Sequence, residues 1–236
     1  MVRWPTRTAV ALFAALVAGL ANAAVVGPGR DRWEEVTFNG IPATEFMVQA
    51  DGTVHVIANR SSGLIHRELT DDERGKPVMR WEWQVSDPLP ATDLTVKGED
   101  DRAIAVHVWF AEKSSRQGLW ARFKRSFAKM AGKPTPGKVI SYTWGGNAPP
   151  GTILPNPFLK KDGVIIILRS ADAETGRWLG EEVDVMADFE RAFGYRPAPP
   201  ARIAISGDSD DSAMRSRAAV RRIRFLPQDD KDTESR

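Results

Sequence analysis

The chain has 236 residues, and its charge balance and lack of cysteine already exclude several classes of protein. Its 33 basic residues stand against 31 acidic ones, so the chain as a whole lacks the positive excess of a nucleic-acid-binding surface. With no cysteine, disulfide frameworks, thiolate catalysis and cysteine-bound zinc are excluded as well.

Residues 1–23 have the three parts of an export signal. Arg3 and Arg7 precede an apolar run over 9–20, and the run is followed by Ala21-Asn22-Ala23, a pattern that signal peptidases cleave. The run is shorter than the roughly 20 residues that span a bilayer. The sequence therefore predicts a cleaved signal peptide over 1–23 and a periplasmic or extracellular mature protein without a transmembrane span. A retained N-terminal anchor is the alternative.

Alternation of apolar and polar residues dominates the rest of the chain and predicts strands. Within 78–86, Met79, Trp81, Trp83 and Val85 fall on one side, so both tryptophans are predicted core residues. Residues 102–112 alternate in the same way, and residues 164–168 are continuously apolar, as expected for a strand covered on both faces. Further strands are predicted at 44–49, 53–59, 138–144, 201–206 and 219–225.

Two segments have apolar residues at helical spacing instead. The first, over 118–131, carries basic residues beside an apolar stripe, which suits packing against a sheet or, alternatively, binding to an anionic membrane surface. The second begins at Asp184, a suitable N-cap, and ends before Gly194. This pattern predicts one antiparallel β-sandwich of the jelly-roll or concanavalin-like kind, with two short helices, over 24–227. A polar, disordered tail is predicted over 228–236.

Several short motifs follow one another in a characteristic order. They are Ser61-Ser62-Gly63-Leu64, Trp81-x-Trp83, Gly98-Glu99-Asp100-Asp101, Ile140-x-Tyr142-x-Trp144 and Gly207-Asp208-Ser209-Asp210-Asp211. In this order the chain resembles domain-of-unknown-function family 3047, a group of exported bacterial proteins, from about Trp33 to Phe225. The resemblance implies one all-β domain and no particular activity, because the family has no established one.

Two acidic turns are the candidate polar sites. Asp208, Asp210 and Asp211 follow a predicted strand, and closely spaced carboxylates supply the oxygen ligands that calcium prefers. A plain turn, in which aspartates bond their own backbone, is the alternative. Asp100 and Asp101 open the strand over 102–112. They form a ligand-binding site with the first turn if the two turns meet in space, and otherwise only end a strand.

Aromatic residues supply the other candidate binding surface. Tyr142 and Trp144 are candidates for stacking on sugar rings, although their alternation in register with Ile140 favours burial in the core. His107 lies beside Trp109 on a face otherwise lined by alanine, which predicts a hydrogen-bonded packing residue rather than a metal ligand.

The sequence predicts no catalytic residue. Glu182-x-Asp184 resembles the start of a laminarinase-like glycosidase motif, but Ala187 stands where the acid/base would be, and helix capping explains Asp184 more simply. We therefore expect an exported, non-catalytic β-sandwich that binds a glycan or another component of the cell envelope. The alternatives are a hydrolase or lyase acting on envelope polysaccharide and a structural or assembly protein of the envelope.

Overall fold

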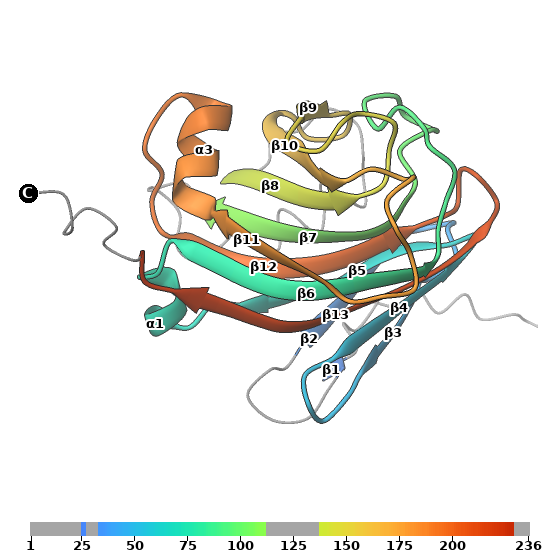
Figure 1. The fold of residues 1–236 in the computed structure, drawn as a ribbon, viewed down its shortest axis with the longest axis horizontal. Coiled ribbons are helices and arrows are strands. Elements are labelled where there is room, and N and C mark those ends of the chain that lie inside the picture. Colours follow the sequence, from blue (N-terminus) through green and yellow to red (C-terminus); the bar gives the residue numbers. More distant parts are fainter. Residues whose placement is uncertain (1–24, 27–32, 112–136, 229–236) are drawn as a thin grey trace, which may run out of the picture.

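The computed structural model describes residues 25–26, 33–111 and 137–228, which form two stacked β-sheets (Figure 1). The predicted signal peptide over 1–23, the predicted helix over 118–131 and the predicted tail beyond residue 228 lie outside the described residues. None of the helices in the described part of the chain has the length and apolar character needed to cross a membrane.

The larger sheet has eight strands, with the spatial order β1-β2-β5-β12-β7-β8-β10-β9. Their bounds are β1 Val25–Val26, β2 Trp33–Thr37, β5 Ser62–Glu68, β7 Arg102–Ala111, β8 Gly137–Trp144, β9 Ile153–Asn156, β10 Lys160–Arg169 and β12 Pro200–Asp208. All neighbours are antiparallel except β8 and β10. That pair is parallel because β9 takes the edge position and the chain then returns between β9 and β8.

The smaller sheet has five antiparallel strands, with the spatial order β11-β6-β13-β4-β3. Their bounds are β3 Glu45–Val48, β4 Val54–Asn59, β6 Val78–Asp87, β11 Leu179–Asp184 and β13 Arg215–Leu226. The predicted antiparallel β-sandwich is thus confirmed, with one parallel pair added. Every predicted strand overlaps an observed one, and β1, β2, β5, β9 and β11 were not predicted because their alternation is short or interrupted.

Aromatic side chains fill the space between the sheets. Trp81 and Trp83 of β6 are 2% and 0% exposed, which confirms that both are core residues. Across the interface Trp81 meets Tyr142 of β8, and Trp83 meets Trp144, each with ring centroids 5.7 Å apart. Tilted and edge-on contacts of this kind add to the gain from burying the rings.

Two short helices accompany the sheets in the described part of the chain, and α3 (Val185–Phe193) stands at one end of the sandwich (Figure 1). Its N-cap is Asp184, whose Oδ1 accepts hydrogen bonds from the backbone N–H groups of Met186 and Ala187 at 3.0 and 2.9 Å. The chain leaves α3 at Gly194 with a φ of 77°, as a glycine C-cap allows. The predicted second helix is confirmed, and Asp184 is its cap.

Helix α1 (Asp71–Arg74) was not predicted. Its four residues are too few to show an apolar period, and none of them is buried. The signal that identifies it is a capping box, in which Thr70 and Glu73 each bond the other's backbone N–H.

Candidate functional site

The outer face of the eight-stranded sheet, turned away from the core, holds a cleft of about 290 Å³. This volume lies at the small end of the range for ligand sites. Side chains of β5, β12, β7 and β8 form the floor, namely Ser62, Leu64, His66, Arg102, His107, Trp109, Val139, Ser141, Ala204, Ser206 and Asp208. The walls come from the segment that follows β2 and from the turn between β9 and β10, and are made by Phe38, Asn39, Ile41, Asn156, Phe158 and Leu159.

The two acidic turns meet at one end of this cleft. Because β12 and β7 are antiparallel, the end of β12 lies beside the start of β7, and Asp208 is in register with Arg102. The carboxylate of Asp101 accepts a hydrogen bond from the backbone N–H of Ser212 at 2.7 Å and another from that of Asp211 at 3.4 Å. Of the two interpretations that the sequence left open for Asp100 and Asp101, the structure has the one in which the turns meet, and all five aspartates of the turns line the cleft.

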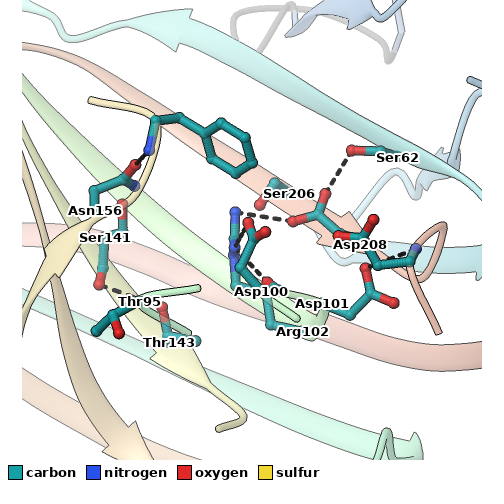
Figure 2. Close-up of polar contacts among 12 residues, drawn as sticks. Ser62, Thr95, Asp100, Asp101, Arg102, Ser141, Thr143, Asn156, Ser206 and Asp208 are labelled. Atoms are coloured by element: carbon teal, nitrogen blue, oxygen red, sulfur yellow. Dashed lines mark hydrogen bonds and ion pairs between the residues drawn. The ribbon is translucent and has the colours of Figure 1, made fainter. Parts of the chain in front are cut away.

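Arg102 sits between the carboxylates of the two turns, as Figure 2 shows. Its Nη2 lies 2.8 Å from Oδ2 of Asp208, and its Nη1 donates to the backbone carbonyl of Asp100 at 2.8 Å. The Arg102 side chain is only 11% exposed. Two ion pairs therefore hold a buried guanidinium at the junction, the second being the 3.6 Å approach of Nη1 to Oδ2 of Asp100.

Sequence alternation missed Arg102 because the strand is irregular at its start. Residue 102 shares parity with Ile104 and Val106, which are core residues. The pairing of β12 with β7 shifts register between Ser206 and Asp208, and a bulge of this kind redirects a side chain to the other face. The guanidinium consequently points into the cleft.

The carboxyl groups at this end of the cleft are costly to ionise. Burial raises the pKa of Asp208 to about 6, although the Arg102 guanidinium opposes the shift. Partial burial, together with the neighbouring Asp210, raises the pKa of Asp211 to about 6. Burial also raises the pKa of Asp100 and that of Asp210. One guanidinium thus faces several carboxylates that it compensates only in part.

Two buried atoms at this junction have no hydrogen-bond partner in the described part of the protein. They are Oδ1 of Asp100 and Nε of Arg102. Buried polar atoms of folded proteins are normally bonded to protein or to ordered water. These two atoms mark where an incoming polar group would find an unused acceptor and an unused donor.

In the predicted calcium turn, Asp208 contacts a guanidinium and a hydroxyl group. Asp208 directs its oxygens at Arg102 and at the Ser62 hydroxyl, which donates to Oδ1 at 2.8 Å. Among the described residues, no three acidic or histidine side chains are grouped to hold a metal ion. The guanidinium supplies at least part of the positive charge that closely spaced carboxylates require. Calcium binding by Asp208, Asp210 and Asp211 stays a prediction.

His107 lies on the cleft floor between two serine hydroxyls. Its Nδ1 is 2.9 Å from Oγ of Ser141, and its Nε2 is 2.9 Å from Oγ of Ser206. Burial and the Arg102 charge lower the pKa of His107 to about 3, so the ring is neutral. A neutral imidazole has one donor and one acceptor, so one serine donates to it and the other accepts from it. The accepting serine keeps its own proton available to a ligand.

Tyr142 and Trp144 do not line the cleft. They alternate along β8 with Ser141 and Thr143 and therefore lie on the core face, 0% and 1% exposed. The Tyr142 hydroxyl donates to Oδ2 of Asp188 at 2.8 Å. A ligand in the cleft meets neither ring.

The aromatic side chains that do line the cleft come from other positions: Phe38, Trp109 and Phe158. Alternation in the sequence does not identify them as cleft residues, because two of them lie outside regular strands. Leu159, which packs with Trp109, closes the same wall. Its close approach depends on Gly163, where an added Cβ would lie 2.5 Å from that of Leu159.

Residues 31–224 match the family model described as "Protein of unknown function (DUF3047)", and the chain therefore belongs to that family. The resemblance drawn from the sequence motifs is confirmed. No curated protein matches the chain.

Solved structures of similar shape include three glycan-degrading enzymes. A cellulase derived from Cel12A of Rhodothermus marinus is 11% identical, with a TM-score of 0.45, over 88% of this chain and 96% of that one. The xyloglucanase domain of NopAA from Sinorhizobium fredii is 11% identical, with a TM-score of 0.38, over 88% and 92% of the two chains. Endoglucanase 3 of Trichoderma harzianum is 10% identical, with a TM-score of 0.41, over 85% and 92%. Likenesses this distant carry no argument about activity.

Proposed function

We propose that this DUF3047 protein is exported and binds a glycan, or another envelope component with the same chemistry, in the cleft of the eight-stranded sheet. The observation that carries the proposal is the cleft itself, which combines apolar aromatic walls with a floor of hydrogen-bonding groups. Sites for small molecules are typically apolar clefts with a few placed polar groups.

A sugar ring suits both parts of this lining. Its C–H faces pack on aromatic and aliphatic side chains, here Phe158 and Leu64. Its hydroxyl groups both donate and accept hydrogen bonds. The aspartates at one end of the cleft accept them, and the serine that accepts from His107 donates one.

Export is the part of the proposal that rests on residues 1–23, with their basic start, apolar run and Ala21-Asn22-Ala23 site. Mass spectrometry of the protein recovered from the periplasm or the medium tests it. A mature N-terminus at Ala24 supports export with cleavage, and an intact Met1 on membrane-bound protein contradicts it.

A binding role fits the chemistry of the floor better than catalysis does. His107, with its lowered pKa of about 3, is a weak base at neutral pH. One observation favours a second candidate, a glycan hydrolase: Asp211 lines the cleft with a pKa raised to about 6, which suits a general acid. Release of reducing ends from a bound polysaccharide, lost in Asp211→Asn, distinguishes the hydrolase from a binding protein.

A glycan array probed with the exported protein, with and without calcium, tests the proposed function. Ala204 is a floor residue, so Ala204→Trp fills the cleft and should abolish binding of any glycan that the array identifies. Ser86→Trp, at an exposed position of β6, is the matched control and should bind normally. Unchanged binding by Ala204→Trp places the ligand elsewhere, and an array without any bound glycan contradicts the proposal.

A further inference from the structure

The acidic end of the cleft carries more negative charge than the described residues balance there. Five carboxylates line it, those of Asp100, Asp101, Asp208, Asp210 and Asp211, and Arg102 is the base among them. The other arginine of the lining, Arg202, lies six residues away along β12 and pairs with Glu68. The acidic end therefore keeps an excess of acceptors over donors and of negative over positive charge.

The side chain of Asp100 is an independent sign of a missing group. It is 7% exposed and lines the cleft, and its Oδ1 has no hydrogen-bond partner among the described residues. Arg102 approaches the other oxygen, Oδ2, and bonds the Asp100 backbone carbonyl. Because an ionised carboxylate only accepts hydrogen bonds, Oδ1 requires a donor that the described residues do not supply.

Three kinds of donor or cation can meet that requirement. A hydroxyl or a water molecule satisfies Oδ1 but leaves the charge uncompensated. A hard metal ion needs several oxygen ligands around one point, and the described residues contain no group of three metal-binding side chains. An ammonium group brings three N–H donors and one positive charge, so it supplies both the hydrogen-bond donor that Oδ1 lacks and the positive charge that the carboxylates lack.

We propose that the acidic end of the cleft binds a protonated amine, and hence that the glycan of the proposed function is an amino sugar with a free, non-acetylated amine. This inference rests on the proposed function, because the apolar walls receive the sugar ring while Asp100 and Asp210 receive its ammonium group. The recognised feature is the positive charge at the ring edge.

The test compares two probes that differ only at the amine. Oligomers of glucosamine and of N-acetylglucosamine, matched in length, are titrated into the full-length protein by calorimetry at neutral pH and low salt. We expect the amine form to bind at least about ten-fold more tightly, since a hydrogen-bonded charge is worth that much. The advantage should shrink as salt is added.

Two variants locate the effect. Asp100→Asn removes the buried acceptor charge, and Asp210→Asn removes a half-buried one with little risk to folding. Each should lower affinity for the glucosamine oligomer about ten-fold and leave affinity for the acetylated oligomer unchanged. Glu45→Gln, at an exposed position of β3, removes one negative charge outside the cleft and should change neither affinity.

The outcomes separate this inference from the proposed function. Equal affinities for the two oligomers, or an amine preference that survives both aspartate variants, overturn the amine assignment while glycan binding stands. The same holds if the array identifies only neutral or acidic glycans. If no glycan binds at all, the proposed function fails, and the amine assignment fails with it.

Discussion

The two faces of the eight-stranded sheet are built from alternate residues of the same strands, yet they differ in the charge that their side chains carry. On β8, Tyr142 and Trp144 face the core and pack against the tryptophans of the other sheet. Ser141, between them, faces the cleft and bonds His107. The core face is filled by large apolar side chains, whereas the cleft face holds the buried charges of Asp100, Arg102 and Asp208. The core face therefore contributes most to folding stability, and the cleft face presents the groups that can bind a ligand.

The imbalance on the cleft face has a cost that the core face does not bear. Four aspartates have raised pKa values, with burial as the largest cause. Proteins usually tolerate such local violations where a site is needed and compensate for them elsewhere. The comparison therefore predicts that substitutions on the core face act on folding, and substitutions on the cleft face act mainly on charge and ligand binding.

The largest expected effect is on the core face. Trp144→Ala leaves a cavity next to Trp83 and should lower the free energy of unfolding by about 4 kcal/mol. Urea denaturation followed by circular dichroism measures it. The control is Thr143→Ala, the next residue of the strand on the opposite face, which should cost about 1 kcal/mol. Similar losses for both variants would remove the contrast between the faces.

Arg102→Met is the cleft-face change with the largest expected cost. It leaves the carboxylates of Asp100 and Asp208 facing each other without their cation. Breaking a buried ion pair from one side costs about 3–5 kcal/mol. We expect the lower end, about 3 kcal/mol, because water reaches the 11% exposed side chain. Arg217→Met, at an exposed ion pair with Asp87, should change stability by less than about 1 kcal/mol.

How much of this could be predicted from the sequence depends on how regular each strand is. Strict alternation in β6 and β8 placed Trp81, Trp83, Tyr142 and Trp144 on the core face, although the last two also remained binding candidates. Antiparallel pairing of β7, which follows Asp100, with β12, which ends at Asp208, is a property of the sheet order, and alternation along the sequence does not reveal that order. The meeting of the acidic turns was therefore one of two open interpretations until the strands were placed.

Arg102 could not be predicted, because a single bulge reverses the parity on which the argument depends. Phe38 and Phe158 lie in connections between strands, where no periodicity applies. The start of α1 can be predicted from the sequence through its capping residues, Thr70 and Glu73, although not from an apolar period.

The pH dependence of stability tests the charge imbalance. Burial raises the pKa of Asp208 to about 6, above its usual value, so the folded protein binds a proton more tightly than the unfolded chain. The free-energy cost of ionising Asp208 in the folded protein is therefore present in full above pH 6, and it is relieved as the pH falls from 6 towards 4. We expect the contribution of Asp208 to raise the free energy of unfolding by on the order of 1–3 kcal/mol as the pH falls through this window.

Thermal denaturation at pH 4.5, 5.5 and 6.5 measures this dependence. Asp208→Asn should make the profile shallower, because its side chain has no proton to bind, while Asp211 still binds one in the same pH range. Asp172→Asn, at an exposed position, should leave the profile unchanged. A wild-type melting temperature that falls steadily from pH 6.5 to 4.5 by the same amount in all three proteins would show that Arg102 compensates Asp208 fully.

The smallest expected effect concerns the serines that flank His107. Ser141→Ala removes the partner of Nδ1, 2.9 Å away, and leaves that nitrogen half-buried. Losing one neutral hydrogen bond to which water has access costs about 1 kcal/mol. Ser86→Ala removes an exposed hydroxyl whose hydrogen bond to the Arg217 carbonyl is 3.3 Å long, and should cost less than about 0.5 kcal/mol.

Because neutral His107 carries a single ring proton, ¹⁵N NMR of the ring identifies which nitrogen holds it. If Nε2 holds the proton, Ser206 accepts a hydrogen bond from Nε2, and its own hydroxyl proton stays available to a ligand. Ser206→Ala should then weaken glycan binding more than Ser141→Ala. If Nδ1 holds it, the order reverses. Equal effects on binding, or a ring that titrates near its ordinary pKa, would mean that this pair of hydrogen bonds supports the floor and takes no part in recognition.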